Sequence, residues 1–357
     1  MPASATDRER AVRAAFAEQA HWAERLGSPF TARLCALLGA RLDRESEAGR
    51  RVLDWPGRPE AGADALTLRL CGGLHALVRS GAAPGLAGCY PPYPEAEAEK
   101  LWAALRTALG NPDLLPWLDS APQTNEVGRS AVLMAGLLVI ADRIRQPVEL
   151  LELGASGGLN LMLDRYGYDL GGMRAGDPAS PLRLKPEWKG PPPPAAAVAV
   201  AARRGVDLRP RDLGRDGERL LAYVWPDQQA RLRQLEAALA LAAADPPIVD
   251  KGDAADWLQA RLDTEPRRGT TRVFLHSVAF QYFAPETQAR IAAMIEAAGE
   301  KASAGRPLAW LRFEKRPEDE KYSLRLRLWP GGEDELLAWC HPHGSSIRWV
   351  AGRPPAR

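Results

Sequence analysis

The chain has few of the features that mark disulfide-rich, membrane or nucleic-acid-binding proteins. Only four of its 357 residues are cysteines, and the spacing of Cys35, Cys71, Cys89 and Cys340 fits neither a disulfide framework nor a metal site. The longest apolar run, residues 131–141, is too short to cross a bilayer, and no signal-peptide core stands near the N-terminus. We therefore expect a cytoplasmic protein that does not enter a membrane and whose thiols are reduced and buried or half-buried.

Lysine is scarce as well, since it provides only seven of the 47 basic residues and arginine provides the rest. The formal net charge is +2, and acidic residues are interspersed with the arginines so that no basic stripe forms. This composition argues against nucleic-acid binding through a broad electrostatic face. A small molecule is therefore the expected substrate.

The length of the chain predicts two structural units. In the first 145 residues the apolar positions recur at helical spacing, without strand-like alternation. Helices are expected over residues 8–26, 29–40, 66–79, 95–109 and 126–144, although the pair Gly72-Gly73 weakens the third. The prediction is an all-helical N-terminal domain over residues 1–145, followed by a second domain over 146–357.

In the second domain, short apolar strands alternate with helices. Strands are expected over 147–153, 271–277 and 307–313, and helices over 159–166, 227–244, 254–262 and 285–298. This alternation predicts an α/β fold of the Rossmann type, with a mostly parallel sheet covered on both faces. Near the end, residues 323–328 and 347–350 are expected to form an antiparallel closing pair around Gly331-Gly332.

The most informative segment is the sequence LLELGASGGLN at residues 150–160. It has the order strand, small-residue loop, helix, which lets the backbone turn sharply and lets a ligand approach closely. Glu152, Gly154, Ser156 and Gly158 occupy the four positions of the acid-x-Gly-x-Gly-x-Gly pattern of Rossmann-type methyltransferases, with Ser156 in place of a glycine. The segment predicts a site for S-adenosylmethionine, and it lacks the G-x-G-x-x-G spacing of dinucleotide sites.

Other predicted cofactor contacts follow neighbouring strands, because ligands of such sheets lie beyond the carboxyl ends of the strands. Asp207 would hold the ribose hydroxyls, and Asp253 with Ala254 would contact the base; each aspartate could instead cap a turn or helix. The full predicted cofactor set is Glu152, Gly154, Ala155, Ser156, Gly158, Asp207, Asp253 and Ala254.

His276, Asn125 and Tyr282 are the candidates for the substrate side, where a base or hydrogen-bond donor is needed. A histidine titrates near neutral pH, so His276 suits the role of a general base, although a single histidine on a strand is more often a core residue. The sequence Cys340-His341-Pro342-His343 is at most half a metal site, and no metal is expected.

The same loop also spells G-x-S-x-G, the nucleophile elbow of α/β-hydrolases. Ser156 would then be the nucleophile, with Asp250 or Asp253 and then His276 completing a triad. An elbow requires a positive φ at the serine, whereas a cofactor loop does not. One observation argues against a nucleophile elbow. In hydrolases the elbow normally follows several strands, whereas here the strand at 147–153 is the first strand expected in the chain. A third alternative is a nucleoside-binding protein without catalytic activity.

Several segments together resemble an uncharacterised bacterial family known only as domain of unknown function 2332. They are residues 123–129, 151–161, 164–166, 176–181, 224–228, 252–257, 276–278 and 281–282. The resemblance spans nearly the whole chain. It implies a methyltransferase-like core behind a helical N-terminal region, but it implies no particular reaction, because no substrate is assigned to that family.

Overall fold

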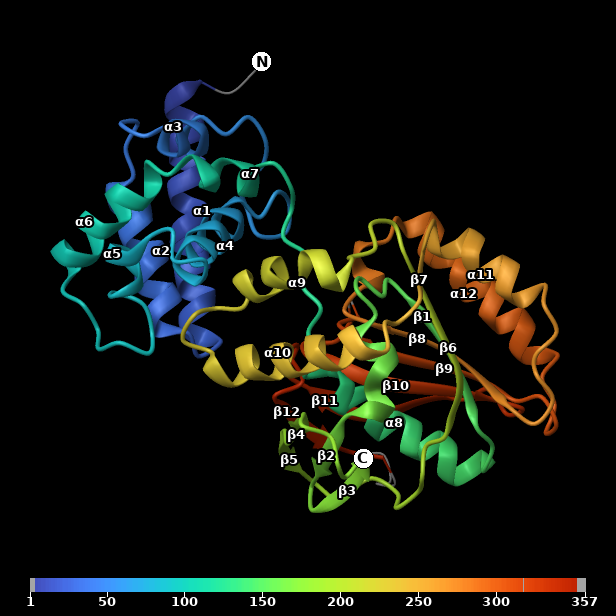
Figure 1. The fold of residues 1–357 in the computed structure, drawn as a ribbon. Helices are drawn as coiled ribbons and strands as arrows, with labels where there is room; N and C mark the ends of the chain where they lie inside the picture. The colour runs from blue at the N-terminus through green and yellow to red at the C-terminus, as the bar shows by residue number, and fades with distance from the viewer. Residues whose placement is uncertain (1–3, 317, 352–357) are drawn as a thin grey trace. The chain divides into compact units, whose positions relative to one another are not determined.

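A computed structural model describes residues 4–316 and 318–351 and divides the chain into two compact units (Figure 1). The helical unit contains the residues up to Thr124 together with Arg215–Arg233, and the sheet unit contains Asn125–Gly214 and the chain from Gln234 onward. The long apolar helix α8 (Arg129–Ile144) belongs to the sheet unit, because its buried residues pack on the strands there. The division therefore falls at different places from the single boundary expected near residue 145.

The helical unit is built from short helices around one apolar core, which contains Phe16, Leu34 and Leu70. Its helices are α1 (Ala5–Arg25), α2 (Pro29–Arg41), α3 (Glu47–Leu53), α4 (Leu66–Arg79), α5 (Pro84–Ala87), α6 (Ala98–Leu109), η1 (Pro112–Leu114) and α7 (Leu115–Leu118), with most of α9 (Leu213–Ala222).

The four cysteines of the chain are free and buried, as expected.

The pair Gly72-Gly73 does not break α4, which runs without interruption over the range expected from the sequence. A Cβ at Gly72 would lie 2.6 Å from the ring of Tyr223, and one at Gly73 would lie 2.5 Å from Leu114. The glycines are thus present for close packing. Tyr223 comes from the second piece of chain in this unit, as does Asp227, which accepts a hydrogen bond from the Phe30 backbone at 2.9 Å.

The sheet unit has a central sheet of nine strands, in which five of the eight pairings are parallel. The order is β5 (Glu187–Lys189), β12 (Ser346–Trp349), β11 (Asp334–Cys340), β10 (Tyr322–Trp329), β9 (Leu308–Glu314), β8 (Thr271–Ser277), β1 (Val148–Leu153), β6 (Val200–Asp207) and β7 (Val249–Lys251). A small sheet has the order β3 (Met173–Gly176), β2 (Gly167–Leu170) and β4 (Arg183–Leu184). The expected mostly parallel α/β sheet is confirmed.

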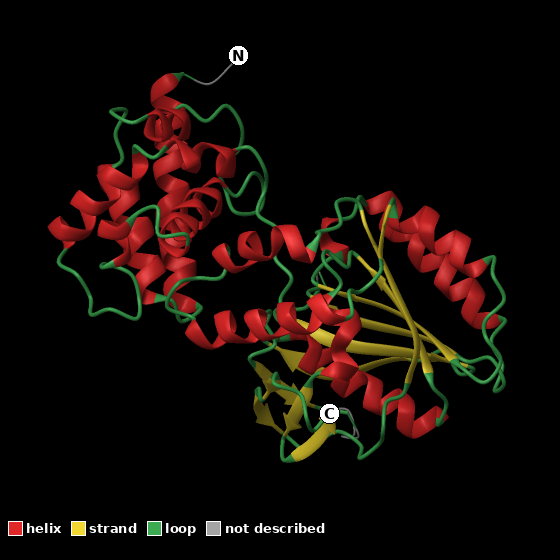
Figure 2. Cartoon of the chain, in the orientation of Figure 1, coloured by secondary structure: helices red, strands yellow, loops and turns green. Residues whose placement is uncertain are grey.

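Helices cover both faces of the central sheet (Figure 2). Helices α11 (Ala254–Leu262) and α12 (Pro285–Glu300) lie side by side on one face, while α8 packs on the other; α10 (Gln229–Ala244) precedes β7. Because side chains alternate along a strand, Leu151 and Leu153 enter the core under α11 and α12, whereas Glu152 points to the α8 face. A Cβ at Gly136 of α8 would lie 2.5 Å from Leu311, so this helix packs close to β9.

The expected closing pair between residues 323–328 and 347–350 is wrong. Strand β11 lies between β10 and β12 and pairs with both. The sequence of β11, DELLAWC, lacks regular alternation, and for that reason its strand was not expected. Gly331 and Gly332, both with positive φ, form the turn from β10 into β11. The helix expected over 159–166 is a 3-10 helix, η2 (Leu159–Arg165).

Candidate functional site

The order in which the chain adds strands to the central sheet reverses at β1. The chain runs from β1 to β6 and β7 on one side, then returns to β8 and β9 on the other. Ligands of open parallel sheets bind beyond the carboxyl ends of the strands at such a reversal. Glu152, Asp207 and Asp253 lie at or just after the carboxyl ends of β1, β6 and β7. The fold thus brings three of the predicted cofactor residues to one edge.

The loop after β1 is held to the neighbouring strand by backbone hydrogen bonds. Gly154 and Ala155 donate to the carbonyl of Val206 at 2.9 and 3.0 Å, and the Ser156 backbone donates to Asp207 Oδ2 at 2.9 Å. These contacts require small residues, because a Cβ on Gly205 of β6 would lie only 2.6 Å from the Ala155 Cβ. Close packing against β6 therefore explains the small residue at Ala155.

Asn125 fixes the far side of the same loop. Its buried Oδ1 accepts hydrogen bonds from the backbone N–H groups of Gly157 and Leu159, each at 3.1 Å. Between these two residues, Gly158 has a φ of +80°, which favours glycine. The structure thus gives Asn125, predicted on the substrate side, a positioning role in the loop.

Glu152 is almost fully buried, at 1% exposure. Its Oε1 accepts a hydrogen bond from Asn160 Nδ2 at 3.2 Å, and Asn160 Oδ1 accepts one from Ser130 Oγ at 2.9 Å. Glu152 Oε2 is buried and has no hydrogen-bond partner among the residues that the structure describes. Burial raises the pKa of the Glu152 carboxyl to about 8, against the opposing effect of the Asn160 bond. At neutral pH this side chain is a neutral acid with a proton to donate.

Asp207 and Asp253 both accept backbone hydrogen bonds, but Asp207 keeps lone pairs on both oxygens whereas Asp253 caps a helix. Asp207 is half-buried and takes one bond on each oxygen, from Ser156 and from Arg209, so lone pairs remain on both. Asp253 Oδ1 accepts from Ala255 and Asp256 and is the N-cap of α11, in agreement with the capping alternative. Its Oδ2 accepts no bond in the described part of the chain. Ala254 is the first, buried residue of that helix.

Leu208 follows Asp207 and is 63% exposed, and no sequence motif predicts a role for it. It gives the carboxyl end of β6 an apolar surface beside a carboxylate. Ile248 is similarly exposed, at 54%, but it precedes β7 and lies at the amino end of that strand. The signal for Leu208 in the sequence is a single apolar residue after a strand-ending acid, which is too short a pattern to recognise alone.

Ser156 has a φ of +54°, the positive value that a nucleophile elbow requires. The remaining members of the predicted triad are engaged elsewhere. Asp250 accepts two bonds from Arg204 and one from Trp257, and Asp253 caps α11. Both ring nitrogens of His276 also have partners. The backbone condition for the elbow is therefore met without its catalytic triad.

His276 faces away from Glu152. In the paired strands Glu152 lies opposite Leu275, so His276, the next residue of β8, points to the α12 face of the sheet. There its Nδ1 lies 2.8 Å from Glu314 Oε1, and its Nε2 accepts from Trp310 Nε1 at 3.2 Å. Tyr282, the third substrate-side candidate, ends the 3-10 helix η3 (Phe280–Tyr282) and is 74% exposed. The three candidates thus occupy three different environments.

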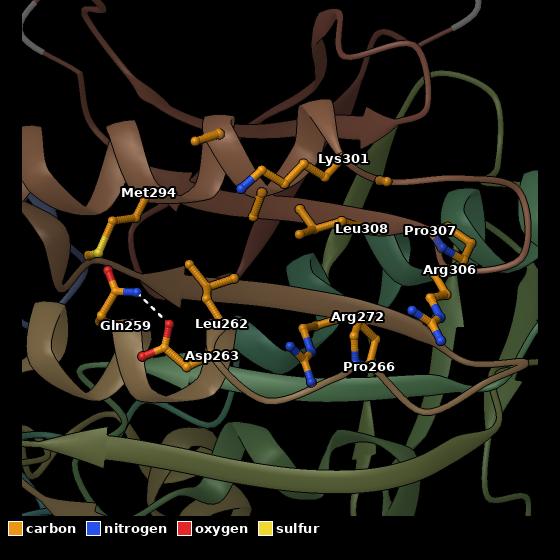
Figure 3. Close-up of a pocket in the computed structure, with 13 residues that line it drawn as sticks. Gln259, Leu262, Asp263, Pro266, Arg272, Met294, Lys301, Arg306, Pro307 and Leu308 are labelled. Carbon is orange, nitrogen blue, oxygen red and sulfur yellow. Dashed lines mark hydrogen bonds between the residues drawn. The ribbon is translucent and has the colours of Figure 1, made fainter.

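A separate pocket of about 380 Å³ lies between α11 and α12 (Figure 3). Arg272 near the start of β8 and Leu308, the first residue of β9, line it, so it opens at the amino ends of the strands. Arg272 is already bonded to Glu149 and to the carbonyls of Arg261 and Thr264. This pocket is at the opposite edge from the predicted cofactor residues.

The described residues include no cluster of three or more histidine, cysteine, aspartate or glutamate side chains arranged to hold a metal ion. Among the described helices, none is long and apolar enough to cross a membrane. No curated protein and no solved structure matches the chain. Residues 13–349 match the family described as an uncharacterized protein conserved in bacteria (DUF2332), and the chain belongs to that family.

Proposed function

We propose that the protein is an S-adenosylmethionine-dependent methyltransferase acting on a small molecule. The observation that carries the proposal is the placement of Glu152, Asp207 and Asp253 at the carboxyl ends of three adjacent parallel strands. The order β7-β6-β1-β8-β9 corresponds to the order 3-2-1-4-5 of a Rossmann-type sheet. The loop from Gly154 to Gly158 stands at its point of reversal.

The residues at this edge suit the parts of the cofactor. Asp207 keeps lone pairs for two ribose hydroxyls, and Leu208 offers an apolar surface for the flat base. The neutral Glu152, whose Oε2 lacks a partner among described residues, can donate a hydrogen bond to the carboxylate of the methionine part. The bound cofactor would supply an electrophilic methyl group, and these residues would position it for transfer.

Calorimetry tests the proposal directly. We expect S-adenosylmethionine and S-adenosylhomocysteine to bind the full-length protein with micromolar affinity. Leu208→Ser should weaken binding about tenfold by removing apolar contact. Ile248→Ser is the matched control, because it removes a similarly exposed aliphatic side chain from the amino end of the neighbouring strand β7 and should leave the affinity unchanged. Absence of binding to the folded protein, or equal losses in both variants, would overturn the proposal.

A serine hydrolase is the second candidate, favoured by the positive φ of Ser156. It predicts that a fluorophosphonate labels Ser156 and that Ser156→Ala abolishes the label. Since His276 is engaged with Glu314 and Trp310, we expect no labelling. If the cofactor binds but no methyl transfer to any acceptor is found, the third alternative, a non-catalytic nucleoside-binding protein, gains support.

A further inference from the structure

A pocket of about 410 Å³ lies on the α12 face of the sheet, at the carboxyl ends of β8 and β9. His276, Trp310, Glu314 and Arg325 line it from three neighbouring strands, and Phe280 lines it from η3. This volume is in the range of sites for small ligands, roughly 300 to 1,000 Å³. None of these side chains belongs to the predicted cofactor set. His276 was predicted on the substrate side, but it points away from Glu152 to the α12 face, so the pocket is a separate candidate site.

Glu314 is the buried centre of this pocket, at 7% exposure. The backbone N–H groups of Ala279 and Phe280 donate to its Oε1 at 3.0 and 3.1 Å. The chain can direct both groups at one oxygen because it turns at Val278, where φ is +51°. Glu314 Oε2 is also buried, but it accepts no hydrogen bond from the residues that the structure describes. The site therefore holds one carboxyl oxygen with three hydrogen-bond donors and a second, buried oxygen for which the described residues provide no donor.

His276 supplies the third hydrogen-bond donor to Glu314, and its other ring nitrogen is engaged by Trp310. Trp310 Nε1 can only donate, so His276 Nε2 must accept, and the ring proton lies on Nδ1, which donates to Glu314. The ring of His276 also stacks on Phe280, with centroids 4.6 Å apart. The pocket thus combines a carboxyl acceptor with an aromatic wall.

The rim of the pocket is positively charged. Arg312, Arg316 and Arg325 line it, and all three pair with the single carboxylate of Asp334. Arg316 also pairs with Glu318. Lys315, an exposed residue, adds a fourth cationic group to the lining of the pocket. Cationic groups therefore outnumber the carboxylates that pair with them. A ligand with an anionic group would complete this arrangement.

We propose that this pocket binds a small amino-acid-like zwitterion. Its ammonium group would donate to Glu314 Oε2, and its carboxylate would meet the guanidinium groups of Arg312 and Arg325. Its apolar body would lie against Phe280 and the aromatic wall. The proposal rests on the geometry of this pocket alone and does not depend on the methyltransferase activity.

Three probes on the unmodified full-length protein test the two charged contacts. L-Phenylalanine carries both groups, phenethylamine only the ammonium, and hydrocinnamate only the carboxylate. By calorimetry we expect L-phenylalanine to bind at least about tenfold more tightly than either of the others, since each lacks one charge-assisted hydrogen bond. Equal affinity for L-phenylalanine and hydrocinnamate, or no binding of any probe, would overturn the proposal.

Two substitutions of the same chemical kind locate the site. Glu314→Gln keeps an oxygen for the backbone N–H groups of Ala279 and Phe280 but removes the charge and replaces the second oxygen by a donor, so L-phenylalanine binding should fall about tenfold or more. Glu318→Gln removes an exposed carboxylate from the rim of the same pocket and should not weaken binding. Equal losses in the two variants contradict the proposal. If Glu314→Gln does not fold, the three probes on the unmodified protein still decide.

Discussion

Asn160 Nδ2 donates to Glu152 Oε1 at 3.2 Å, which ties the 3-10 helix after the loop to the end of β1. The same amide group donates to Ser277 Oγ of β8 at 3.2 Å. One side chain thus joins two adjacent strands beneath the candidate cofactor site. The carboxyl group that it contacts is buried and protonated at neutral pH, which gives the stability of the sheet unit a specific pH dependence.

The Glu152 carboxyl should destabilise the fold as the pH rises. The folded protein keeps this proton up to about pH 8, whereas the unfolded chain releases it near the ordinary value of 4.5. Between these values the folded state binds more protons, so the free energy of unfolding falls with increasing pH, by up to about 1.4 kcal/mol per pH unit, and levels off above pH 8. Glu152→Gln cannot titrate and should lack this contribution.

Urea unfolding at several pH values between about 5 and about 8 measures this effect. The stability of Glu152→Gln relative to the unmodified protein should increase steadily across the range. Two parallel stability curves would show that Glu152 has no raised pKa in the folded state.

We expect Asn125 to stabilise the protein through its side-chain oxygen, which accepts the two backbone hydrogen bonds of the loop. In Asn125→Ala the buried N–H groups of Gly157 and Leu159 lose their acceptor, which should cost about 2 to 4 kcal/mol in urea unfolding. Asn125→Asp retains the oxygen and should cost about 1 kcal/mol or less, with the affinity for S-adenosylmethionine preserved. A large loss of stability in Asn125→Asp would refute the positioning role.

We expect that the loop after β1 requires a glycine at position 205 of β6. In Gly205→Ala the new methyl group would lie 2.6 Å from the Ala155 Cβ, which has no flexible end to move aside. We expect a loss of about 1 to 3 kcal/mol in stability and weaker binding of S-adenosylmethionine. Gly252→Ala, at the end of β7, meets its nearest atom at 3.9 Å and is the matched control, expected to be neutral. Similar behaviour of the two variants would count against the close packing of the loop.

The ion pair of Arg272 with Glu149 should depend on both partners. The Arg272 side chain is 5% exposed, so Glu149→Leu leaves a buried guanidinium without its counter-charge and should cost about 3 to 5 kcal/mol. The double variant Glu149→Leu/Arg272→Met should cost less than the sum of the single changes. For comparison, Arg290→Met breaks an exposed pair with Asp256 and should cost less than about 1 kcal/mol. Additive losses in the buried pair, measured by urea unfolding, would contradict this view.

The sequence predicts three of the parallel strands of the sheet well. Strands β1, β8 and β9 lie within one residue of their expected bounds, because strands buried on both faces are continuous apolar runs. Strand β11 and the small sheet lack such runs, since contacts with distant residues decide which of their side chains are buried. Helix α4 has the bounds expected from its sequence, and its two glycines do not interrupt it because large side chains fill the space opposite them.

The candidate site was predicted only in part. The acids at the strand ends could be read from the sequence, but the faces to which their side chains point depend on the register between strands. In that register Glu152 lies opposite Leu275, so the side chain of His276 points to the α12 face of the sheet, away from Glu152. Glu314 was overlooked although it directly follows the expected strand 307–313, because its role arises from the turn at Val278 and not from a local motif.

The helical unit is composed of two pieces of chain, and this sets an order on its assembly during synthesis. Residues up to Thr124 cannot complete their packing until Tyr223 and Asp227 have emerged from the ribosome, because these fill the space beside Gly72 and bind the start of α2. By then β1 and β6 have also been made. In many proteins the N-terminal domain folds before the next domain has been synthesised. This order of folding is not possible for the helical unit of this chain.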